Sequence, residues 1–534
     1  MKNDKLNDPF YVKELSERLD FLISVKSAEN SLYEFLKQAW PVIEGKTPFI
    51  DNWHLRVIAE HLEACYRREI KNLLINVPPR TSKTSLISIA FPAWVWLQNP
   101  EERFMYASYA HSLSTEHSLK CRRLIESDWY QNNWMRKYKL AKDQKAKMLF
   151  ENNKGGCRIA TSVGSVATGK GGNIIVVDDG NNARDGESEI KRESTNSWWD
   201  QVLSTRLNNP LRDVRIVVQQ RLHEKDMSGH IIANDIESEW VKLIIPMEFE
   251  EKRKAKTIIL PSTKGSIWED PREKDGELLW PERFSLNIIN RLQRELGSYG
   301  YAGQYQQRPS PLIGGILQRD WFKKYQSPYL PVFNYIIQSW DTAFSDSPTA
   351  AYSTCTTWGV WGEKNEDNLY KVILLSMWRG RVGYPELRDR AKRLAKDYKD
   401  TGVNNNVFPA QSRIDCCLIE AKATGDPLIR DLKEAGIPAI GYDPKGDKTS
   451  RVQRVAPSIE CGLVYLPTED KNKDKLVPFA DEFLETVITF PNSESRDLVD
   501  TMTQTLSYLK DSNILRHSSD EIEKETELVY RPRY

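Results

Sequence analysis

Hydrophobic positions in the first part of the chain recur at the spacing of an amphipathic helix. The pattern runs over about 15–68 and includes Leu15, Leu19, Leu22, Ile23, Leu32, Phe35, Leu36, Leu55, Ile58 and Leu62. Because residues three and four apart share a helix face, this stretch predicts a helical segment. Compact apolar runs follow, bounded by polar residues: LLINV at 73–77, FMYASY at 104–109, NIIVVDD at 173–179 and VRIVVQQ at 214–220. Buried strands that alternate with helical stretches predict an α/β layer on a largely parallel sheet.

The periodic pattern stops at 306–330, where proline and glycine are frequent, and we expect a linker there. Beyond it come the strand-like runs YIIQSWD, STCTTWGVW and YKVILLSMW, a charged helix near 385–399, the strand CCLIE at 416–420 and a helix from about Pro427. This order of elements is that of an RNase H-like fold. We therefore expect a helical segment, an α/β domain, the linker, an RNase H-like domain and a charged tail, at 1–50, 51–305, 306–330, 331–510 and 511–534.

Composition narrows the class of protein. A chain of 534 residues has room for two to four domains, and 40% hydrophobic residues with 16 tryptophans exclude a largely disordered chain. The net charge of +1 means that any contact with nucleic acid must come from local patches. Seven cysteines without a CxxC pair are typical of reduced thiols, and the first residues contain no apolar signal core. We expect a soluble, cytoplasmic protein without a membrane segment.

The segment NLLINVPPRTSKTSLISIAF predicts a strand, a loop and a helix that opens at Lys83 and Thr84. In such a loop, backbone N–H groups and a helix N-terminus hold phosphates, a lysine contacts the outer phosphates, and a hydroxyl binds magnesium. However, Val77 and Ser82 occupy the positions where the usual motif has glycine, and two prolines remove N–H donors. Two interpretations stay open on the loop alone: a phosphate loop, or a polar loop before a helix.

Polar side chains also end two later strands. Asp178 and Asp179 follow the run IIVV, and Gln219, Gln220 and Arg221 end the run VRIVV. A carboxylate at this end of a buried strand is suited to the magnesium of a bound nucleotide, and a second one can orient water. Each feature alone also fits an ordinary turn, but together the three strand ends favour a nucleotide site.

Three acids of the C-terminal half can converge in an RNase H-like fold. Asp341 ends the first strand, Glu420 ends the fourth, and Asp497 begins a late helix, with Asp500 on the same helical face. Clustered acids repel one another unless divalent cations neutralise them. Two magnesium or manganese ions about 4 Å apart would activate water and stabilise the departing 3′ oxygen of a phosphodiester. The alternative is a helix cap at Asp497 and chance acids elsewhere.

At this point the sequence resembles the large subunit of the tailed-phage terminase, the DNA-packaging motor. The resemblance rests on six ordered segments: INVPPRTSKTS, FPAWVW, SVATGKGGNIIVVDD, VVQQRLHEKDMSGHII, LIEAKATGDPLI and SRDLVDTMTQTL. It implies an ASCE-type P-loop ATPase domain followed by an RNase H-like nuclease domain with the triad Asp341, Glu420 and Asp497. It also implies that ATP is contacted by the loop residues Thr81, Ser82, Lys83 and Thr84, by Arg80 at the γ-phosphate, by Trp53 and His54 near the adenine, and by Gln220.

Further roles follow from the resemblance. Asp178 would hold magnesium with Thr84, and Gln219 to Arg221 would couple hydrolysis to movement. Many relatives have glutamate where this chain has Asp179, so the base is either Asp179, which we favour, or Glu187. Lys170 stands where relatives have a finger arginine, either as a trans-acting cation or as a solvated turn residue. Arg496 precedes Asp497 where the family often has a second aspartate, which makes this the least secure part of the nuclease site.

The resemblance implies a motor that uses ATP and magnesium to translocate double-stranded DNA into a procapsid and, with magnesium or manganese, cuts concatemeric DNA. It implies a pentameric ring on a portal protein, a terminase small subunit as partner, and action in the host cytoplasm rather than in the mature virion. Lys422, Lys448 and Arg451, expected in loops, would bind DNA phosphates or be ordinary solvated residues. Two other functions stay open: a DNA repair or remodelling ATPase with a nuclease, and a degenerate scaffold.

Overall fold

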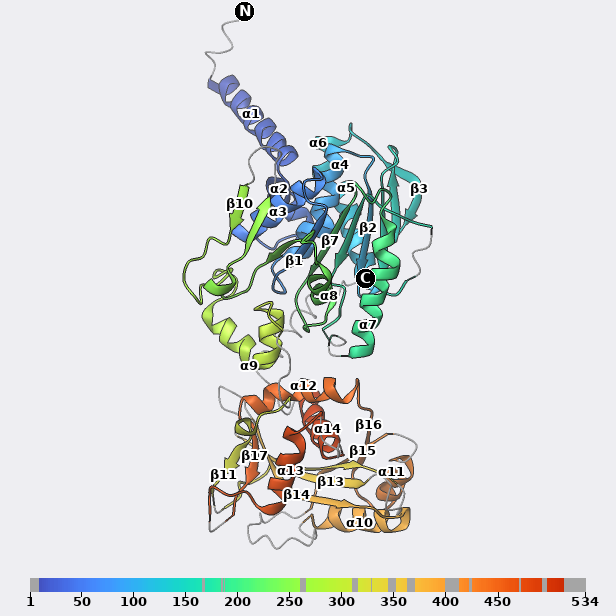
Figure 1. The fold of residues 1–534 in the computed structure, drawn as a ribbon, viewed down its shortest axis with the longest axis vertical. Coiled ribbons are helices and arrows are strands. Elements are labelled where there is room, and N and C mark those ends of the chain that lie inside the picture. Colours follow the sequence, from blue (N-terminus) through green and yellow to red (C-terminus); the bar gives the residue numbers. More distant parts are fainter. Residues whose placement is uncertain are drawn as a thin grey trace, which may run out of the picture. The chain divides into compact units, whose positions relative to one another are not determined.

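The chain forms two compact units, Met1–Asn290 with Tyr299–Ser310, and Arg291–Ser298 with Pro311–Tyr534, hereafter the first and the second unit. They are seen in a computed structural model (Figure 1). It describes residues 9–165, 169–183, 186, 188–259, 266–309, 316–327, 329–343, 352–362, 370–398, 413–421, 425–469, 472–491 and 497–512.

The first unit is built on a sheet of eight strands in the order β3-β4-β5-β2-β6-β7-β1-β8. The six strands from β5 to β8 in that order are parallel, and β3 and β4 extend the edge in antiparallel fashion. The strand bounds are β1 Asn72–Asn76, β2 Arg103–Ser108, β3 Leu140–Ala146, β4 Leu149–Asn152, β5 Cys157–Ser162, β6 Ile174–Asp178, β7 Val214–Gln219 and β8 Val241–Ile244. Because β7 lies between β1 and β6, the sheet has the ASCE-type P-loop arrangement, as predicted.

Helices cover both faces of this sheet. A cluster that includes Leu74, Met105 and Val177 packs against α7 and α8, through Trp198 and Ile231. On the other face, the Tyr106 hydroxyl donates to the Ile87 carbonyl over 2.9 Å, which places the π-helical turn Ser85–Ala90 against the strands. The helices are α1 Pro9–Asn30, α2 Leu32–Ile43, α3 Trp53–Tyr66, α4 Phe91–Gln98, α5 His111–Glu126, α6 Asp128–Trp134, α7 Glu189–Trp198, α8 Met227–Asn234 and α9 Leu286–Gln304, with the hairpin β9 Lys256–Ile259 and β10 Ser266–Glu269.

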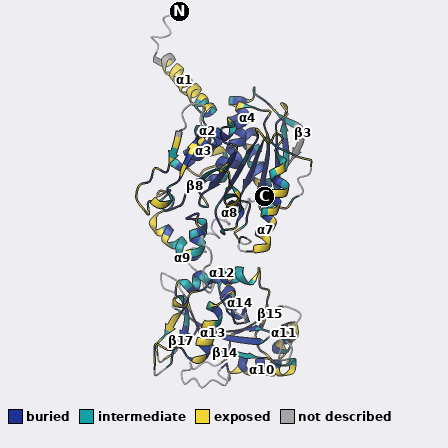
Figure 2. Cartoon of the chain, in the orientation of Figure 1, coloured by how far each residue is buried: buried dark blue, intermediate teal, exposed yellow. Residues whose placement is uncertain are grey.

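The central strands of both sheets are buried, whereas α1 is exposed along most of its length (Figure 2). The expected N-terminal helical segment is therefore two helices of different character, because α2 buries Phe35, Leu36 and Trp40. No helix in the described part of the chain has both the length and the apolarity that a bilayer span requires.

The second unit contains a sheet of seven strands in the order β11-β17-β14-β13-β12-β15-β16. β13 runs antiparallel to both β12 and β14, and β12 pairs in parallel with β15. The sub-order β14-β13-β12-β15-β16 is that of RNase H-like folds, which confirms the prediction. The bounds are β11 Lys323–Tyr325, β12 Tyr335–Asp341, β13 Ser353–Trp361, β14 Lys371–Gly380, α10 Tyr384–Lys396, β15 Cys416–Glu420, α11 Gly425–Glu434, β16 Ala439–Tyr442, α12 Lys448–Glu460, β17 Val464–Pro467, α13 Pro478–Ile488 and α14 Asp497–Asp511.

Two expectations of the sequence analysis differ from the structure. Part of the expected linker belongs to the second unit, because Ile316, Leu317 and Phe322 are buried in its core and β11 pairs with β17. The segment 446–451, expected as a loop, contains the start of α12. Asp447 caps this helix by accepting from the Ser450 N–H over 2.8 Å. The tail from 513 onward lies outside the described residues.

Candidate functional site

The loop between β1 and the next helix has left-handed backbone at two residues that are not glycine. Arg80 and Ser82 both have φ of 62°, in the left-handed region that favours glycine. The Thr81 hydroxyl donates to the Pro78 carbonyl over 2.7 Å, which closes the turn. Left-handed backbone at non-glycine residues costs about 1–3 kcal/mol and is often found at functional sites. The loop therefore holds a strained shape at the position where the sequence predicts phosphate binding.

Of the two residues expected near adenine, His54 contacts this loop. His54 is fully buried, and its Nε2 lies 3.0 Å from the Thr81 carbonyl oxygen. Burial lowers the pKa of His54 to about 4, so the ring is neutral. Trp53 stacks on Trp268 at 5.9 Å between ring centroids, with the Arg272 guanidinium also over its ring. His54 thus contacts the loop through Thr81, and adenine contacts by Trp53 and His54 stay predictions.

The helix after the loop opens at Lys83 and Thr84, as predicted, and its first residues face the end of β6. Lys83 is buried, and its ammonium forms an ion pair with Asp179. Asp179, like Ser82, has positive φ, at 54°. Burial raises the pKa of Asp179, and the neighbouring Asp178 raises it further, whereas Lys83 and the backbone N–H of Gln220 lower it. The structure therefore brings the predicted phosphate lysine and the favoured base into direct contact.

Asp178 is held beside that pair by a residue that the sequence analysis missed. The Ser88 hydroxyl donates to Asp178 Oδ2 over 2.6 Å, and His117 Nδ1 lies 3.6 Å from the same oxygen. Asp178 is 1% exposed, yet its Oδ1 has no hydrogen-bond partner among the described residues. A buried carboxylate oxygen without a partner is costly unless a cation binds it. This oxygen therefore fits a ligand of a divalent cation, and a share of Thr84 in that site stays a prediction.

Ser88 stands four residues after Thr84, so both lie on one helical face. That spacing is the signal by which sequence reasoning could have found it. The π-helical turn that contains Ser88 is a rare backbone form that occurs often at functional sites.

The polar residues at the end of β7 differ in their contacts. Gln219 is 1% exposed, and neither atom of its side-chain amide has a hydrogen-bond partner among the described residues. Arg221, in contrast, forms a buried ion pair with Asp226 at 3.0 Å and donates to the carbonyls of His223 and Glu224. Arg221 is therefore held in the loop after the strand, whereas Gln219 is free to accept a new partner.

The remaining ATPase expectations stay predictions. Arg80 is exposed at the loop, and Lys170 is exposed ahead of β6. Glu187, the alternative base, lies outside the described residues.

Replacing Ser88 with alanine is expected to raise the magnesium concentration for half-maximal ATP hydrolysis about tenfold, because a hydrogen bond to a charged group contributes about 1.5 kcal/mol. The measurement is a magnesium titration of steady-state hydrolysis. Ser118→Ala is the matched control, since Ser118 is also buried and its hydroxyl has no partner among the described residues. An equal effect of both variants would mean that Ser88 only fills space.

In the second unit, four acids gather at one end of the sheet. Trp340 of β12 pairs with Ile419 of β15, so the residues that follow, Asp341 and Glu420, end adjacent parallel strands. Asp497 and Asp500 lie in the first turn of α14, which packs on β12 and β13. Burial and repulsion from Asp500, Glu420 and Asp497 raise the pKa of Asp341 to about 7. The three predicted acids and Asp500 are therefore electrostatic neighbours.

Basic side chains already face two of these acids. Asp500 is 6% exposed, and its carboxylate contacts Lys448 at 2.5 Å and Arg451 at 2.7 Å. Asp497 pairs with Arg379 at 3.3 Å. The prediction that Lys448 and Arg451 lie in loops is wrong, since both are on α12 and neutralise Asp500. Lys422 and Arg496 lie outside the described residues.

The acid cluster has suitable ligands for a metal ion but does not have them arranged around one point. Four carboxylates are the right donors for magnesium or manganese, and their mutual repulsion would be relieved by a cation. However, no group of three His, Cys, Asp or Glu side chains among the described residues is arranged to hold an ion. Asp497 and Asp500 face arginine and lysine instead. Ion binding by more than two of these acids therefore requires side chains to move.

The raised pKa of Asp341 predicts a pH-dependent stability. Its folded pKa of about 7 exceeds the ordinary aspartate value of 3.8, so the folded state binds the proton more tightly. The stabilisation is present below about pH 4 and is lost as pH rises towards 7. In urea unfolding without metal, the second unit should therefore be less stable at pH 8 than at pH 5, and Asp341→Asn should reduce that difference. An unchanged difference in the variant would contradict the prediction.

No known protein family and no curated protein sequence matches the chain. Among solved structures, it is similar to the large terminase of a thermophilic bacteriophage in complex with ADP, at 11% identity and a TM-score of 0.45, over 84% of this chain and 97% of that chain. The HK97 bacteriophage large terminase matches at 11% identity and a TM-score of 0.30, over 86% of this chain and 95% of that one.

The resemblance is to phage large terminases. It extends to the large terminase nuclease from thermophilic phage G20c with bound magnesium, at 12% identity and a TM-score of 0.24, over 37% of this chain and 98% of that chain. Whole large terminases and an isolated terminase nuclease are therefore both among the structures similar to this chain.

Proposed function

We propose that the chain is the large subunit of a viral DNA-packaging machine. In this proposal the first unit hydrolyses ATP to drive double-stranded DNA into a procapsid, and the second unit cuts concatemeric DNA at the phosphodiester backbone. The observation that carries the proposal is the pairing, in one chain, of an ASCE-type sheet that brings Lys83 to Asp178 and Asp179 with an RNase H-like sheet that gathers Asp341, Glu420, Asp497 and Asp500.

In the ATPase unit, Lys83 would release Asp179 and contact the outer phosphates of ATP. The strained loop would turn its N–H groups and the helix N-terminus towards the same phosphates. Once Lys83 has moved, Asp179 loses the cation that lowers its pKa, and its carboxylate becomes a better base for the attacking water. Magnesium, held by Thr84 and Asp178, would supply charge neutralisation between the phosphates. Gln219, with an unpartnered buried amide, is suited to sense the departure of the outer phosphate.

In the nuclease unit, Asp341, Glu420 and Asp497 would hold the divalent ions, and Asp500 would assist. Magnesium or manganese there would supply an activated water and would stabilise the leaving oxygen. Lys448 and Arg451 contact Asp500 and would have to give up part of this contact for Asp500 to assist. Arg379, which pairs with Asp497, would contact the scissile phosphate.

The same proposal includes how the chain assembles with other copies and with partner proteins. A packaging motor of this kind would work in the host cytoplasm as a ring, expected to be a pentamer, docked on a portal protein and assisted by a small subunit. The direct test measures both activities on one preparation of the full chain: ATP hydrolysis with and without duplex DNA, and plasmid cleavage in manganese. Absence of the first activity would remove the motor, and absence of the second would remove the nuclease.

A further inference from the structure

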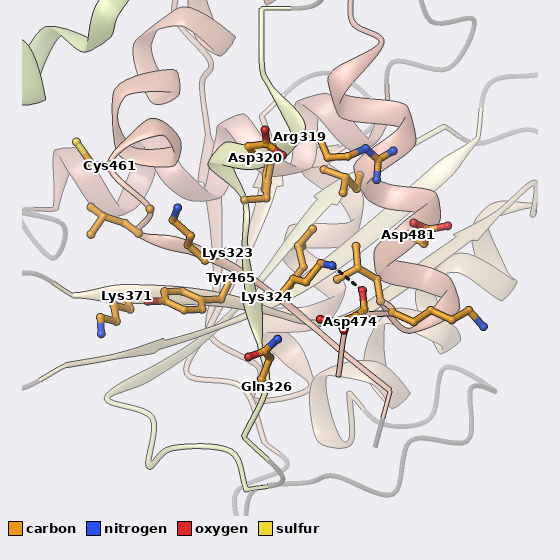
Figure 3. Close-up of a pocket in the computed structure, with 17 residues that line it drawn as sticks. Arg319, Asp320, Lys323, Lys324, Gln326, Lys371, Cys461, Tyr465, Asp474 and Asp481 are labelled. Carbon is orange, nitrogen blue, oxygen red and sulfur yellow. Dashed lines mark hydrogen bonds between the residues drawn. The ribbon is translucent and has the colours of Figure 1, made fainter. Parts of the chain in front are cut away.

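A groove of about 920 Å³ lies in the second unit (Figure 3), and none of the four acids of the cluster lines it. Its floor is apolar and includes Phe322, Leu466 and Leu484, all buried. Five basic side chains line it: Arg319, Lys323, Lys324, Lys371 and Lys475. We call it the lysine groove. Three carboxylates, Asp320, Asp474 and Asp481, line it as well, so its formal charge is positive.

Two of the lysines are available for an external anion. Among the described residues, Lys323 and Lys371 have no carboxylate partner, and the Lys371 ammonium lies 5.7 Å from the centre of the Tyr465 ring. Figure 3 places Lys323, Lys371 and Tyr465 on one side of the groove, with Asp474 and Asp481 on the other. By contrast, Lys475 pairs with Glu469 at 2.7 Å, and Lys324 donates to the Asp474 carbonyl over 2.6 Å.

The backbone leaves room for one of these lysines. Gly462 has φ of +75°, and a Cβ built there would lie 2.7 Å from Lys323 Cε. A side chain at 462 would therefore displace Lys323. Because Lys323 pairs in register with Tyr465, and Tyr465 pairs with Ile373, the three positions share one face of the sheet, together with Lys371 two residues before Ile373.

The groove and the acid cluster lie at opposite ends of β14. This strand starts at Lys371, in the groove, and reaches Arg379, which pairs with Asp497. At about 3.3 Å per residue, the eight steps between them span roughly 26 Å. The same length corresponds to about 8 base pairs of duplex DNA at 3.4 Å per phosphate along one strand.

We propose that the lysine groove binds the phosphate backbone of duplex DNA, through Lys323 and Lys371, about 8 base pairs from the phosphodiester that the acid cluster cuts. This rests on the proposed nuclease function. Lysine contacts phosphate as a point charge and reads no base, so the contact is independent of sequence. The groove thus anchors long DNA at a distance from the cut.

The test compares the double variant Lys323→Ala/Lys371→Ala with wild type in the full chain. Binding of a 30-base-pair duplex is measured in a metal chelator across 50–200 mM salt. Loss of two phosphate contacts should reduce the slope of log affinity against log salt by about 1.8, so wild type loses about twelvefold more affinity than the variant over this range. Lys396→Ala/Lys433→Ala, at exposed lysines on α10 and α11, is the matched control and should keep the wild-type slope.

Cleavage supplies the second measurement. A 12-base-pair duplex cut near its centre cannot reach the groove, so the variant and wild type should cut it equally. A 30-base-pair duplex can reach it, and its KM should rise about tenfold in the variant. An unchanged salt slope, as expected if the groove binds an acidic protein instead, would overturn the proposal, and so would equal effects on both duplexes. If wild type cut neither duplex, the nuclease function would fail, whereas the salt slope would still test DNA binding by the groove.

Discussion

Replacing Lys83 with alanine should lower DNA-stimulated ATP hydrolysis by at least about a hundredfold, because one charged donor aimed at developing charge contributes this much or more. Lys83 is buried at the start of the helix and paired with Asp179, so no other described cation takes its place in that contact. The measurement is steady-state phosphate release by the full chain, with saturating duplex DNA.

Lys71→Ala is the matched control, since Lys71 is exposed just before β1, at the opposite end of that strand from the loop. It should keep the wild-type rate. Unchanged phosphate release by Lys83→Ala would remove the ATPase assignment and would favour a scaffold whose loop binds no nucleotide. Plasmid cleavage by the same variant should persist, because the acid cluster belongs to the other unit.

Asp341→Ala should lower plasmid cleavage in manganese by about a thousandfold and leave ATP hydrolysis intact. Asp341 is the acid whose pKa is raised to about 7 by burial and by Asp500, Glu420 and Asp497, so it lies within the cluster. A metal ligand that supplies about 4 kcal/mol of transition-state stabilisation gives a change of this size. The measurement is the conversion of supercoiled to nicked and linear plasmid.

The raised pKa of Asp341 also predicts how cleavage depends on pH. A protonated carboxyl binds a cation poorly, so cleavage by wild type should increase as pH rises through about 7. Asp389→Ala is the control, because Asp389 is exposed on α10 and pairs with its neighbour Arg388. Full cleavage by Asp341→Ala would place the cutting centre elsewhere.

Long apolar runs with polar ends were predictable from the sequence. The runs YIIQSWD, STCTTWGVW and CCLIE match the bounds of β12, β13 and β15, and nearly all of their residues are buried. Short strands were not predictable in this way. β8, β11, β16 and β17 have three or four residues each and gain their pairing partners only in the folded sheet.

The acids of both sites were found in the sequence because each ends a strand or begins a helix. The basic partners of these acids could not be predicted from the sequence, since ion pairs form between residues far apart in the chain. The helical position of Lys448 and Arg451 depends on the cap at Asp447 and on the apolar face of Val452, Val455 and Ile459. Their contact with Asp500 depends on α12 packing against α14, which no local pattern records.

The acid cluster takes its members from two strands of the RNase H-like core, β12 and β15, and from α14, the last described helix. Asp497 and Asp500 reach Asp341 only when α14 has docked, through Leu498, Met502 and Leu506, against the rest of the core. A ribosome makes β12 long before α14. A nascent or truncated chain without that helix therefore lacks two of the four carboxylates, so the proposed metal site is complete only once synthesis of the unit is complete.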